Sequence, residues 1–341
     1  MKRRLLALSS CVLVIVVVWL AWVGLTPSPS ELEKVTLVLN WSPNGTHAAY
    51  YVALKEGFFR DQGLDVEILE GTGSGTTVKV IGAGREEFGL AGAESVAIGR
   101  SKGVPIVSIA AIYQKSAVAF LTLESSGIND FKDLPGRTMG VKFGSSTYPF
   151  YEATLKQLSI DRNRIKEVSI GPGVEHLLAG KVDAMDGQID NEGVQIQERG
   201  FPVHAILYDE IGVKTYGITL IAHEKTIAER PKMVGKFVHA ILKGWSLTLA
   251  DPDKAAAAVC HMNPTLDKKI VVAQTRAAIG LISSPDSTAN GLGWQTEDGW
   301  QTTIETLTKI GQINSKLDVN GLFTIDFLRN SEKVDINRVQ R

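Results

Sequence analysis

Short apolar runs and longer amphipathic stretches alternate along most of the chain. Each short run is bounded by glycine or polar residues, a pattern that predicts buried β-strands. In the first third, strands are expected at 35–41, 64–69, 88–91 and 104–113. Helices are expected between them, at 47–59, from the 71–75 loop to Ala83, and at 94–102. This strand–helix–strand rhythm predicts a mostly parallel sheet with helices on both faces.

A second set of elements begins near Ala117. Strands are expected at 117–123, 138–142, 166–170, 183–186, 203–207 and 216–223. Helices are expected at 147–158, 173–180, 190–199, from Pro231 onward, 252–260, 267–280 and 296–310. Proline suits the first position of a helix, and apolar residues recur on one helical face after Pro231. The segment after Ser315 is weakly patterned.

The two sets predict an α/β protein of two lobes, with the second lobe inserted into the first. Residues 35–113 and 216–315 would form lobe 1, and residues 117–212 would form lobe 2. Two extended crossings, near 113–117 and 212–216, would join them, and residues 316–341 would form a C-terminal tail. Ligands of such sheets bind beyond the carboxyl ends of the strands. A cleft between two hinged lobes is therefore the expected pocket.

The N-terminus predicts attachment to a membrane. Three basic residues at 2–4 precede an uncharged run, 5–25, which is long enough to span a bilayer as a helix. Basic residues before such a run predict a cytoplasmic start and an extracytoplasmic body. We expect residues 1–25 to act as an uncleaved membrane anchor or signal, and residues 26–34 as a stiff tether. Lipidation at Cys11 is the alternative, because the residues before it resemble an acylation box.

Composition narrows the classes of function. The chain has 44% hydrophobic residues, 21% charged residues and a formal net charge of −1, which is typical of a globular protein. It has no basic tract interleaved with aromatic residues, so nucleic acid is not an expected partner. Cys260 is the only cysteine of the exported body, so no intramolecular disulfide is expected there. The six histidines show no metal-ligand spacing, and no cofactor, metal or catalytic group is expected.

Several segments resemble one known family. The stretch VTLVLNWSPNGTHAAYYVALKEGFFRDQGLDVEI (35–68) is similar to solute-binding proteins related to the thiamine-pyrimidine synthases of yeasts, including the ThiY-type proteins. The segments 84–114, 127–141 and 176–184 follow in the same order. The resemblance implies a type II periplasmic-binding-protein fold and, as partners, the permease and ATPase subunits of an ABC importer. The stretch GSSTYPFYEA (144–153) is most similar to the riboflavin-binding, RibY-type members.

The resemblance leaves an enzyme as an alternative, because the yeast relatives make thiamine pyrimidine. In those enzymes a motif after the third strand carries a cofactor lysine and a donor histidine. Here the similar stretch GLAGAES (89–95) has Ala91 and Ser95 in those places, and the cysteine-rich iron motif is missing. A sensor ectodomain is a further alternative, but only residues 1–4 would remain in the cytoplasm. We therefore expect a binding protein and not an enzyme.

The candidate ligand-binding residues follow the predicted strands. Trp41 ends the first strand, where its ring is expected either to stack on a flat heterocycle or to pack in the core. The glycine-rich stretch 71–77 has Ser74 before a helix, which suits either an anion or a simple turn. The other candidates are polar or aromatic residues at similar places: Asn40, Asn44, Glu94, Ser95, Tyr113, Ser145, Ser146, Thr147, Tyr148, Asn191, Glu192 and Tyr216.

Riboflavin is the first expected ligand, and a thiamine-precursor pyrimidine (formylaminopyrimidine or hydroxymethylpyrimidine) is the second. Both are flat and rich in nitrogen, which suits an indole ring flanked by asparagine and glutamate. No cluster of arginine and lysine is obvious around the predicted cleft, so sulfonate and nitrate are less expected.

Overall fold

The computed structural model describes residues 32–143, 145, 147–314 and 317–336. The chain divides into two compact units, Met1–Glu33 and Lys34–Arg341. The predicted membrane anchor and Cys11 lie outside the described residues. Within the described ranges, no helix has both the length and the apolar character needed to cross a membrane.

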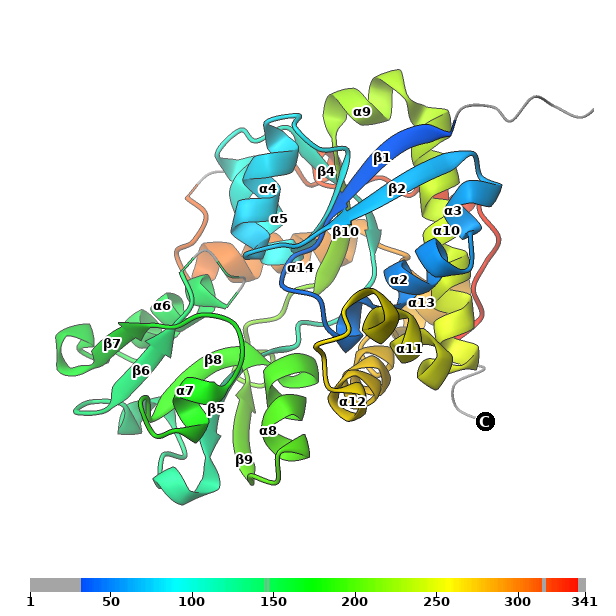
Figure 1. The fold of residues 1–341 in the computed structure, drawn as a ribbon. Helices are drawn as coiled ribbons and strands as arrows, with labels where there is room; N and C mark the ends of the chain where they lie inside the picture. Colours follow the sequence, from blue (N-terminus) through cyan, green and yellow to red (C-terminus); the bar gives the residue numbers. More distant parts are fainter. Residues whose placement is uncertain (1–31, 144, 146, 315–316, 337–341) are drawn as a thin grey trace, which may run out of the picture. The chain divides into compact units, whose positions relative to one another are not determined.

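The second unit contains a first five-stranded sheet with the strand order β2-β1-β3-β10-β4 (Figure 1). Strand β3 runs parallel to β1, whereas β10 runs antiparallel to both β3 and β4. The strands are β1 (Glu33–Val38), β2 (Leu64–Leu69), β3 (Phe88–Gly92), β4 (Ile106–Ala111) and β10 (Ile218–His223).

A second five-stranded sheet has the order β7-β6-β8-β5-β9. Strand β6 runs parallel to β7 and β8, whereas β5 runs antiparallel to β8 and β9. The strands are β5 (Val118–Leu123), β6 (Thr138–Val141), β7 (Lys166–Ser169), β8 (Ala184–Gln188) and β9 (Val203–Leu207). The chain passes from the first sheet to the second between β4 and β5, and it returns between β9 and β10.

Both sheets are mostly parallel, as predicted, and each contains one strand that runs against its neighbours, β10 in the first sheet and β5 in the second. The reason lies in the two crossings. Strand β5 arrives from the first sheet and β10 arrives from the second, so each enters its new sheet at the edge where the neighbouring strands end. Each therefore runs against the strands beside it. The carboxyl ends of β1, β3, β6 and β8 consequently face the space between the two sheets.

Helices cover the faces of both sheets. Those that accompany the first sheet are α2 (Ala48–Lys55), α3 (Phe58–Asp61), α4 (Ser74–Gly82), α5 (Ala93–Ser101), α9 (Glu224–Glu229), α10 (Pro231–Ala250), α11 (Pro252–Met262), α12 (Lys268–Ile279), α13 (Pro285–Asn290), α14 (Glu297–Lys309) and α15 (Asp326–Arg329). Those that accompany the second are α6 (Tyr148–Gln157), α7 (Glu175–Leu178) and α8 (Val194–Glu198), which follows a π-helix over Ile189–Gly193. The helix predicted over 47–59, with a stop near Gly57, ends at Lys55, and a short helix follows Gly57, which adopts a left-handed conformation with φ of 80°.

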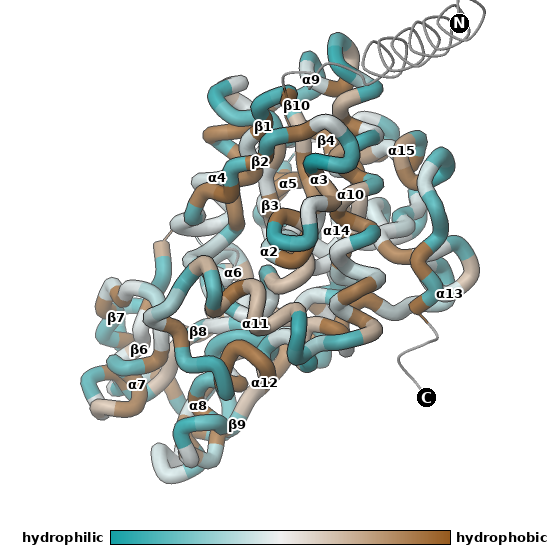
Figure 2. The backbone as a smooth tube through the Cα atoms, turned by 45° about the vertical axis from the view of Figure 1, so that its right-hand side comes forward, coloured by the Kyte–Doolittle hydropathy of each residue, from teal (hydrophilic) through white to brown (hydrophobic). Residues whose placement is uncertain are grey.

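Helix α10 anchors the core of the first sheet. Pro231 stands at its first turn, as its fixed φ favours, and the helix buries one long apolar face. The ring of Phe237 stacks on Phe88 of β3 at a centroid distance of 3.8 Å, and on Phe59 at 5.2 Å. Hydrophobic segments gather along the strands and the inner helices in Figure 2. This packing holds the first sheet rigid behind the loops at its carboxyl edge.

The C-terminal segment packs against the first sheet although its sequence is weakly patterned. Phe323 forms a parallel bridge with Ser108 of β4, and Leu322 and Leu328 are buried. Gln295 ties the same region together, because its side chain bonds to Ser108 and to the backbone oxygen of Thr324. The described part of this segment, 317–336, thus covers the edge of the sheet formed by β4.

Candidate ligand-binding site

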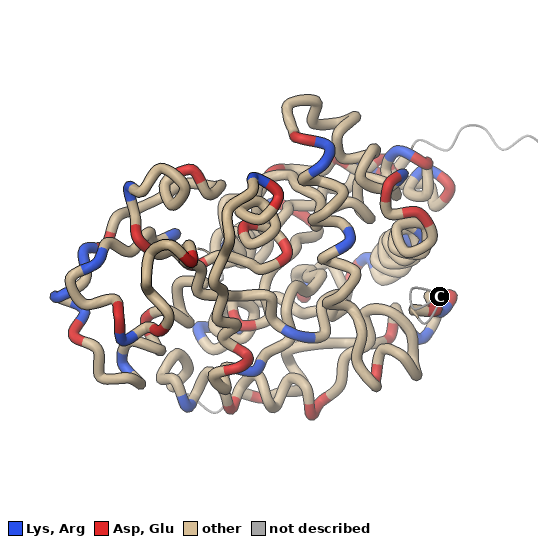
Figure 3. The backbone as a smooth tube through the Cα atoms, turned by 90° about the horizontal axis from the view of Figure 1, so that it is seen from below, with Lys and Arg blue, Asp and Glu red and all other residues tan. Residues whose placement is uncertain are grey.

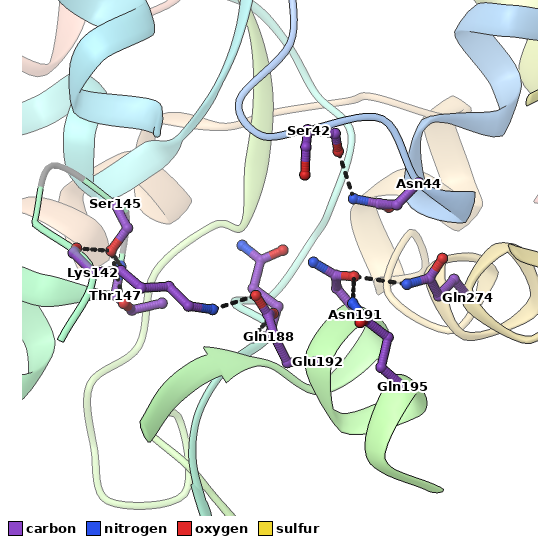
Figure 4. Close-up of polar contacts among 10 residues, drawn as sticks. All are labelled: Ser42, Asn44, Lys142, Ser145, Thr147, Gln188, Asn191, Glu192, Gln195 and Gln274. Carbon is purple, nitrogen blue, oxygen red and sulfur yellow. Dashed lines mark hydrogen bonds and ion pairs between the residues drawn. The ribbon is translucent and has the colours of Figure 1, made fainter. Parts of the chain in front are cut away.

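A pocket lies between the carboxyl ends of the two sheets. The first sheet and its loops contribute Asn40, Trp41, Gly73 and Ser74. The second contributes Lys142, Ser145, Thr147, Gly187, Gln188, Asn191 and Glu192. Figure 4 shows the polar side chains around this space.

The loop that carries Trp41 is held at the carboxyl edge of the first sheet, because a second loop, at Gly71, approaches its backbone closely. The N–H of Gly71 donates to the carbonyl oxygen of Trp41 at 3.2 Å. A Cβ atom at Gly71 would lie 1.8 Å from the carbonyl oxygen of Leu39, so only glycine allows the two loops to meet here. The side chain of Trp41 is half-buried and lines the pocket.

A hydrogen bond from the neutral ring of His47 fixes the orientation of the Asn40 side chain. Burial lowers the pKa of His47 to about 3, so its ring is uncharged at neutral pH. The Nε2 atom of His47 lies 3.1 Å from Oδ1 of Asn40 and donates to it. This bond turns the amide nitrogen of Asn40 away from His47.

The ammonium of Lys142 forms a buried ion pair with the carboxylate of Glu192. Both side chains are almost fully excluded from solvent, with 3% and 4% exposure. The other Glu192 oxygen accepts from the N–H of Gln188 at 2.9 Å. Sequence reasoning missed Lys142, although it directly follows the buried strand β6, the same kind of place that drew attention to Trp41.

The π-helix that follows β8 directs three consecutive polar residues to three different partners. Asp190 accepts a hydrogen bond from Tyr113, Asn191 accepts one from Gln274, and Glu192 pairs with Lys142. The wider turn of a π-helix is often found at functional sites. Here it brings Asn191 and Glu192 to the pocket and leaves Asp190 at the crossing between the sheets.

Tyr113 and Asp190 join the two sheets near the crossings. The Tyr113 hydroxyl donates to Oδ2 of Asp190 at 2.9 Å, and both residues are buried. Burial raises the pKa of the Asp190 carboxyl to about 7, although the bond from Tyr113 opposes that rise. Tyr113 therefore contacts the hinge side of the structure and does not line the pocket.

Two hydroxyl residues expected before α6 do line the pocket. The Ser145 hydroxyl donates to the backbone oxygen of Lys142 at 2.7 Å and lies 2.8 Å from Oγ1 of Thr147. Ser74 also lines it, and its Oγ accepts from the N–H of Gly92 at 3.0 Å, which links α4 to the end of β3. Ser146 lies outside the described residues.

The remaining sequence candidates lie outside the pocket. Glu94 is buried beside Ser95, whose hydroxyl donates to it at 2.9 Å, and burial raises the pKa of Glu94 to about 7. Asn44 caps the turn before α2, where its side chain accepts from the N–H of Thr46. Tyr148 contacts Arg162 and Glu152, and Tyr216 packs on α14 through Thr296 and Trp300. These contacts give each of the five a structural role.

A second, open cavity adjoins the first and shares Trp41 and Asn191 with it. Its wall is polar and includes Gln195 and Arg199 of the second lobe. Arg199 pairs there with Glu175 at 2.8 Å. From the first lobe it includes Asn44, Thr265 and Asp267. The two cavities therefore have two lining residues in common.

Two further features limit the chemistry of the site. Within the described residues, no group of three or more histidine, cysteine, aspartate or glutamate side chains is arranged to hold a metal ion. Basic and acidic residues are interspersed along the backbone in Figure 3, which fits the near-zero net charge. The pocket itself pairs one cation with one anion.

Curated relatives fall into binding proteins and synthases. The chain is 26% identical to the riboflavin-binding protein RibY of Chloroflexus aurantiacus, over 96% of this chain and 98% of that one. It is 28% identical to the 4-amino-5-hydroxymethyl-2-methylpyrimidine phosphate synthase THI13 of Saccharomyces cerevisiae, over 74% and 78%. It is 24% identical to the formylaminopyrimidine-binding protein of Halalkalibacterium halodurans, over 83% and 87%.

Solved structures show the fold. A protein from Bordetella bronchiseptica matches with a TM-score of 0.74 and 20% identity, over 88% of this chain and 96% of that one. The alkanesulfonate-binding protein SsuA of Xanthomonas axonopodis, bound to MOPS, matches with a TM-score of 0.64 and 13% identity, over 87% and 99%. The chain thus has the periplasmic-binding-protein fold, with two α/β lobes, as expected. The family described as NMT1/THI5 like matches residues 44–255, and this chain belongs to that family.

Proposed function

We propose that the chain is the extracytoplasmic solute-binding subunit of an ABC importer and that its ligand is riboflavin. The fold it shares with importer subunits and its similarity to two vitamin- or precursor-binding proteins support the capture role. Two lobes around one pocket suit capture by closure and release by opening. The ligand would leave chemically unaltered.

The observation that carries the choice of ligand is the arrangement of Trp41 opposite a charge-balanced polar wall. Stacking of a flat heterocycle on an aromatic ring contributes about 1–3 kcal/mol per base in nucleic-acid-binding proteins. Across the pocket, Lys142, Asn191 and Glu192 offer both donors and acceptors. The isoalloxazine ring of riboflavin carries carbonyl oxygens and an imide N–H on one edge, which match that combination. Because Lys142 is neutralised by Glu192, the wall suits a neutral ring better than a small anion.

The second cavity supports riboflavin over a pyrimidine. A ring stacked on Trp41 would have the polar second cavity beside it, and a ribityl chain needs a polar space for its hydroxyl groups. A formylaminopyrimidine has no comparable chain. It remains the second candidate, since one binding relative carries that name.

We further propose that residues 1–25 hold the body at the outer face of a membrane and that separate permease and ATPase chains complete the importer. The uncharged run 5–25 after three basic residues supports the anchor. Lipidation at Cys11 is the alternative attachment. The catalytic alternative, pyrimidine synthesis, is supported by the relatives that are named as synthases.

Calorimetry on the detergent-solubilised full chain tests the ligand. Riboflavin, formylaminopyrimidine, an alkanesulfonate and nitrate are titrated in turn, and each is repeated as a thermal-unfolding shift. A ligand at 100 times its Kd adds about 2.7 kcal/mol to the unfolding free energy. Saturable binding of riboflavin with unchanged ligand recovered afterwards supports the proposal. Binding of the pyrimidine alone would reverse the order of ligands, and chemical conversion of a bound ligand would overturn the binding role.

A further inference from the structure

A backbone N–H fixes the orientation of a buried glutamine at the edge of the pocket. The N–H of Gly45 donates to Oε1 of Gln274 at 2.9 Å. A backbone N–H can only donate, so the atom of Gln274 that faces it must be the oxygen. The amide nitrogen of Gln274 must then point the other way. Gly45 reaches this place because it has no side chain: a Cβ there would lie 2.1 Å from the carbonyl oxygen of Val271 on α12.

The fixed glutamine in turn fixes Asn191. The Nε2 atom of Gln274 donates to Oδ1 of Asn191 at 2.7 Å, and Nε2 of Gln195 donates to the same oxygen at 2.9 Å. With its oxygen held by two donors, Asn191 turns its amide nitrogen the other way. In Figure 4 this nitrogen points away from Gln274, toward the side of the pocket that holds Gln188. Asn191 is buried and lines both cavities.

The bond between Gln274 and Asn191 joins the two lobes. Gln274 lies on α12, which packs with the first sheet, and Asn191 lies on the π-helix after β8 of the second. Helix α12 also meets α8 through the pair Lys269 and Glu198, at 2.9 Å. In Figure 1 the two helices lie side by side. Separating the lobes would break the contact with Gln274 and remove one of the two constraints on the Asn191 amide.

We propose that Gln274 is a positioning residue that, on lobe closure, presents the amide nitrogen of Asn191 as a hydrogen-bond donor to the ligand. The ligand must then carry an acceptor, a ring carbonyl oxygen, on the edge that faces Asn191. This inference rests on the proposed function and adds this requirement on the ligand to it. Ligand recognition and lobe closure are then coupled, because the Gln274 side chain makes the contact between the lobes and also determines that Asn191 presents a donor to the ligand.

The test changes one atom of the hydrogen-bond relay from Gly45 through Gln274 to Asn191, so that an acceptor faces Asn191 in place of a donor. In Gln274→Glu one carboxylate oxygen still accepts from Gly45, but the other faces Asn191 as an acceptor. Asn191 then turns its nitrogen toward position 274 and its oxygen toward the ligand. We expect riboflavin affinity, measured by flavin fluorescence or calorimetry, to fall at least tenfold. Gln301→Glu places the same charge on the exposed face of α14 and should leave affinity unchanged.

Thio-substituted flavins separate positioning from mere stability. 2-Thioriboflavin and 4-thioriboflavin each replace a ring carbonyl oxygen with sulfur, a weaker acceptor. The native chain should bind one of them several-fold more weakly than riboflavin, and Gln274→Glu should lose that discrimination. Gln274→Met keeps the length of the side chain without its amide and should show the same loss if Gln274→Glu does not fold.

The results of these binding measurements distinguish a positioning role of Gln274 from a purely structural one. Loss of discrimination in the folded variant supports the relay. Equal discrimination in the native chain and both variants, even with weaker binding, shows that Gln274 only holds the lobes together and overturns the inference. Equal affinity of the native chain for all three flavins also overturns it. No binding of riboflavin by the native chain defeats the proposed function instead.

Discussion

The Nζ atom of Lys142 lies 5.4 Å from the centroid of the Trp41 ring, so a cation from one lobe faces an aromatic ring from the other. Such a contact contributes about 0.5–2 kcal/mol. A flat ligand that stacks on Trp41 would take the place of the ammonium over the ring. Lys142 would keep its ion pair with Glu192, because that pair does not involve the Trp41 ring.

Replacing Trp41 should remove ligand binding without unfolding the protein. Its side chain is half-buried, so Trp41→Ala should change the unfolding free energy by less than the 3–5 kcal/mol typical of a core tryptophan. Riboflavin affinity should fall about tenfold or more, and Trp41→Phe should restore part of it. Calorimetry and chemical unfolding measure both. Phe201→Ala, at an exposed site, is the control; equal losses of fold and binding in Trp41→Ala would assign the ring to packing.

Lys142 and Glu192 should depend on each other. Lys142→Met or Glu192→Gln leaves one buried charge without its partner, which typically costs about 3–5 kcal/mol of unfolding free energy. The double variant should lose much less than the sum of the two, because no unpaired charge remains. Urea unfolding of all four proteins measures this coupling. Arg276→Met breaks an exposed pair with Asp253 and should cost about 1 kcal/mol or less. Additive losses would contradict the pairing.

Asp190 should make stability depend on pH. Its pKa is about 7 in the folded protein, raised by burial from 3.8, so between pH 4 and pH 7 the folded state binds the proton more tightly than the unfolded state. The unfolding free energy of the native chain, relative to Asp190→Asn, should therefore fall as pH rises through this window. One proton sets a limit of about 1.4 kcal/mol per pH unit. Unfolding both proteins at several pH values measures the difference, and a constant difference would contradict it.

Gly71→Ala should disturb the Trp41 loop. Its Cβ would lie 1.8 Å from the carbonyl oxygen of Leu39, which is backbone and cannot move aside without shifting the end of β1. We expect both lower stability and weaker riboflavin binding, seen by thermal unfolding and calorimetry. Gly171→Ala is a matched control for loss of a glycine, since no atom lies within 4 Å of its Cβ and its φ is not positive. Native affinity in Gly71→Ala would show that the loop tolerates the shift.

The arrangement of strands and helices was largely predictable because most elements have an apolar face. The strands 64–69 and 203–207 have the predicted bounds. Three helices, α9, α13 and the four-residue α15, were missed. Helix α9 buries none of its residues, and α13 is a polar turn capped by Ser284, so neither carries an apolar stripe. The one antiparallel strand in each sheet, β10 and β5, was not predicted, because an apolar run does not show from which lobe the chain arrives.

The site was predictable only in part. Asn40, Trp41, Ser74, Ser145, Thr147, Asn191 and Glu192 follow strands or begin helices, and the pocket contains all of them. Lys142 and Gln188 stand at similar strand ends and were overlooked. Gln274 offered no local signal, because it lies within α12 and reaches Asn191 only through the packing of residues far apart in the sequence. Glu94 and Tyr216 satisfied the same local rule but point to partners inside one lobe.

The position of β10 between β3 and β4 has a consequence for how the protein is made. The first sheet contains β1 to β4, yet its fourth place is filled by residues 218–223, which leave the ribosome after the whole second sheet. Until then β4 has no neighbour that joins it to β3. During synthesis the inserted lobe can therefore complete its hydrogen bonding first, and the lobe that begins the chain must wait for its last strand.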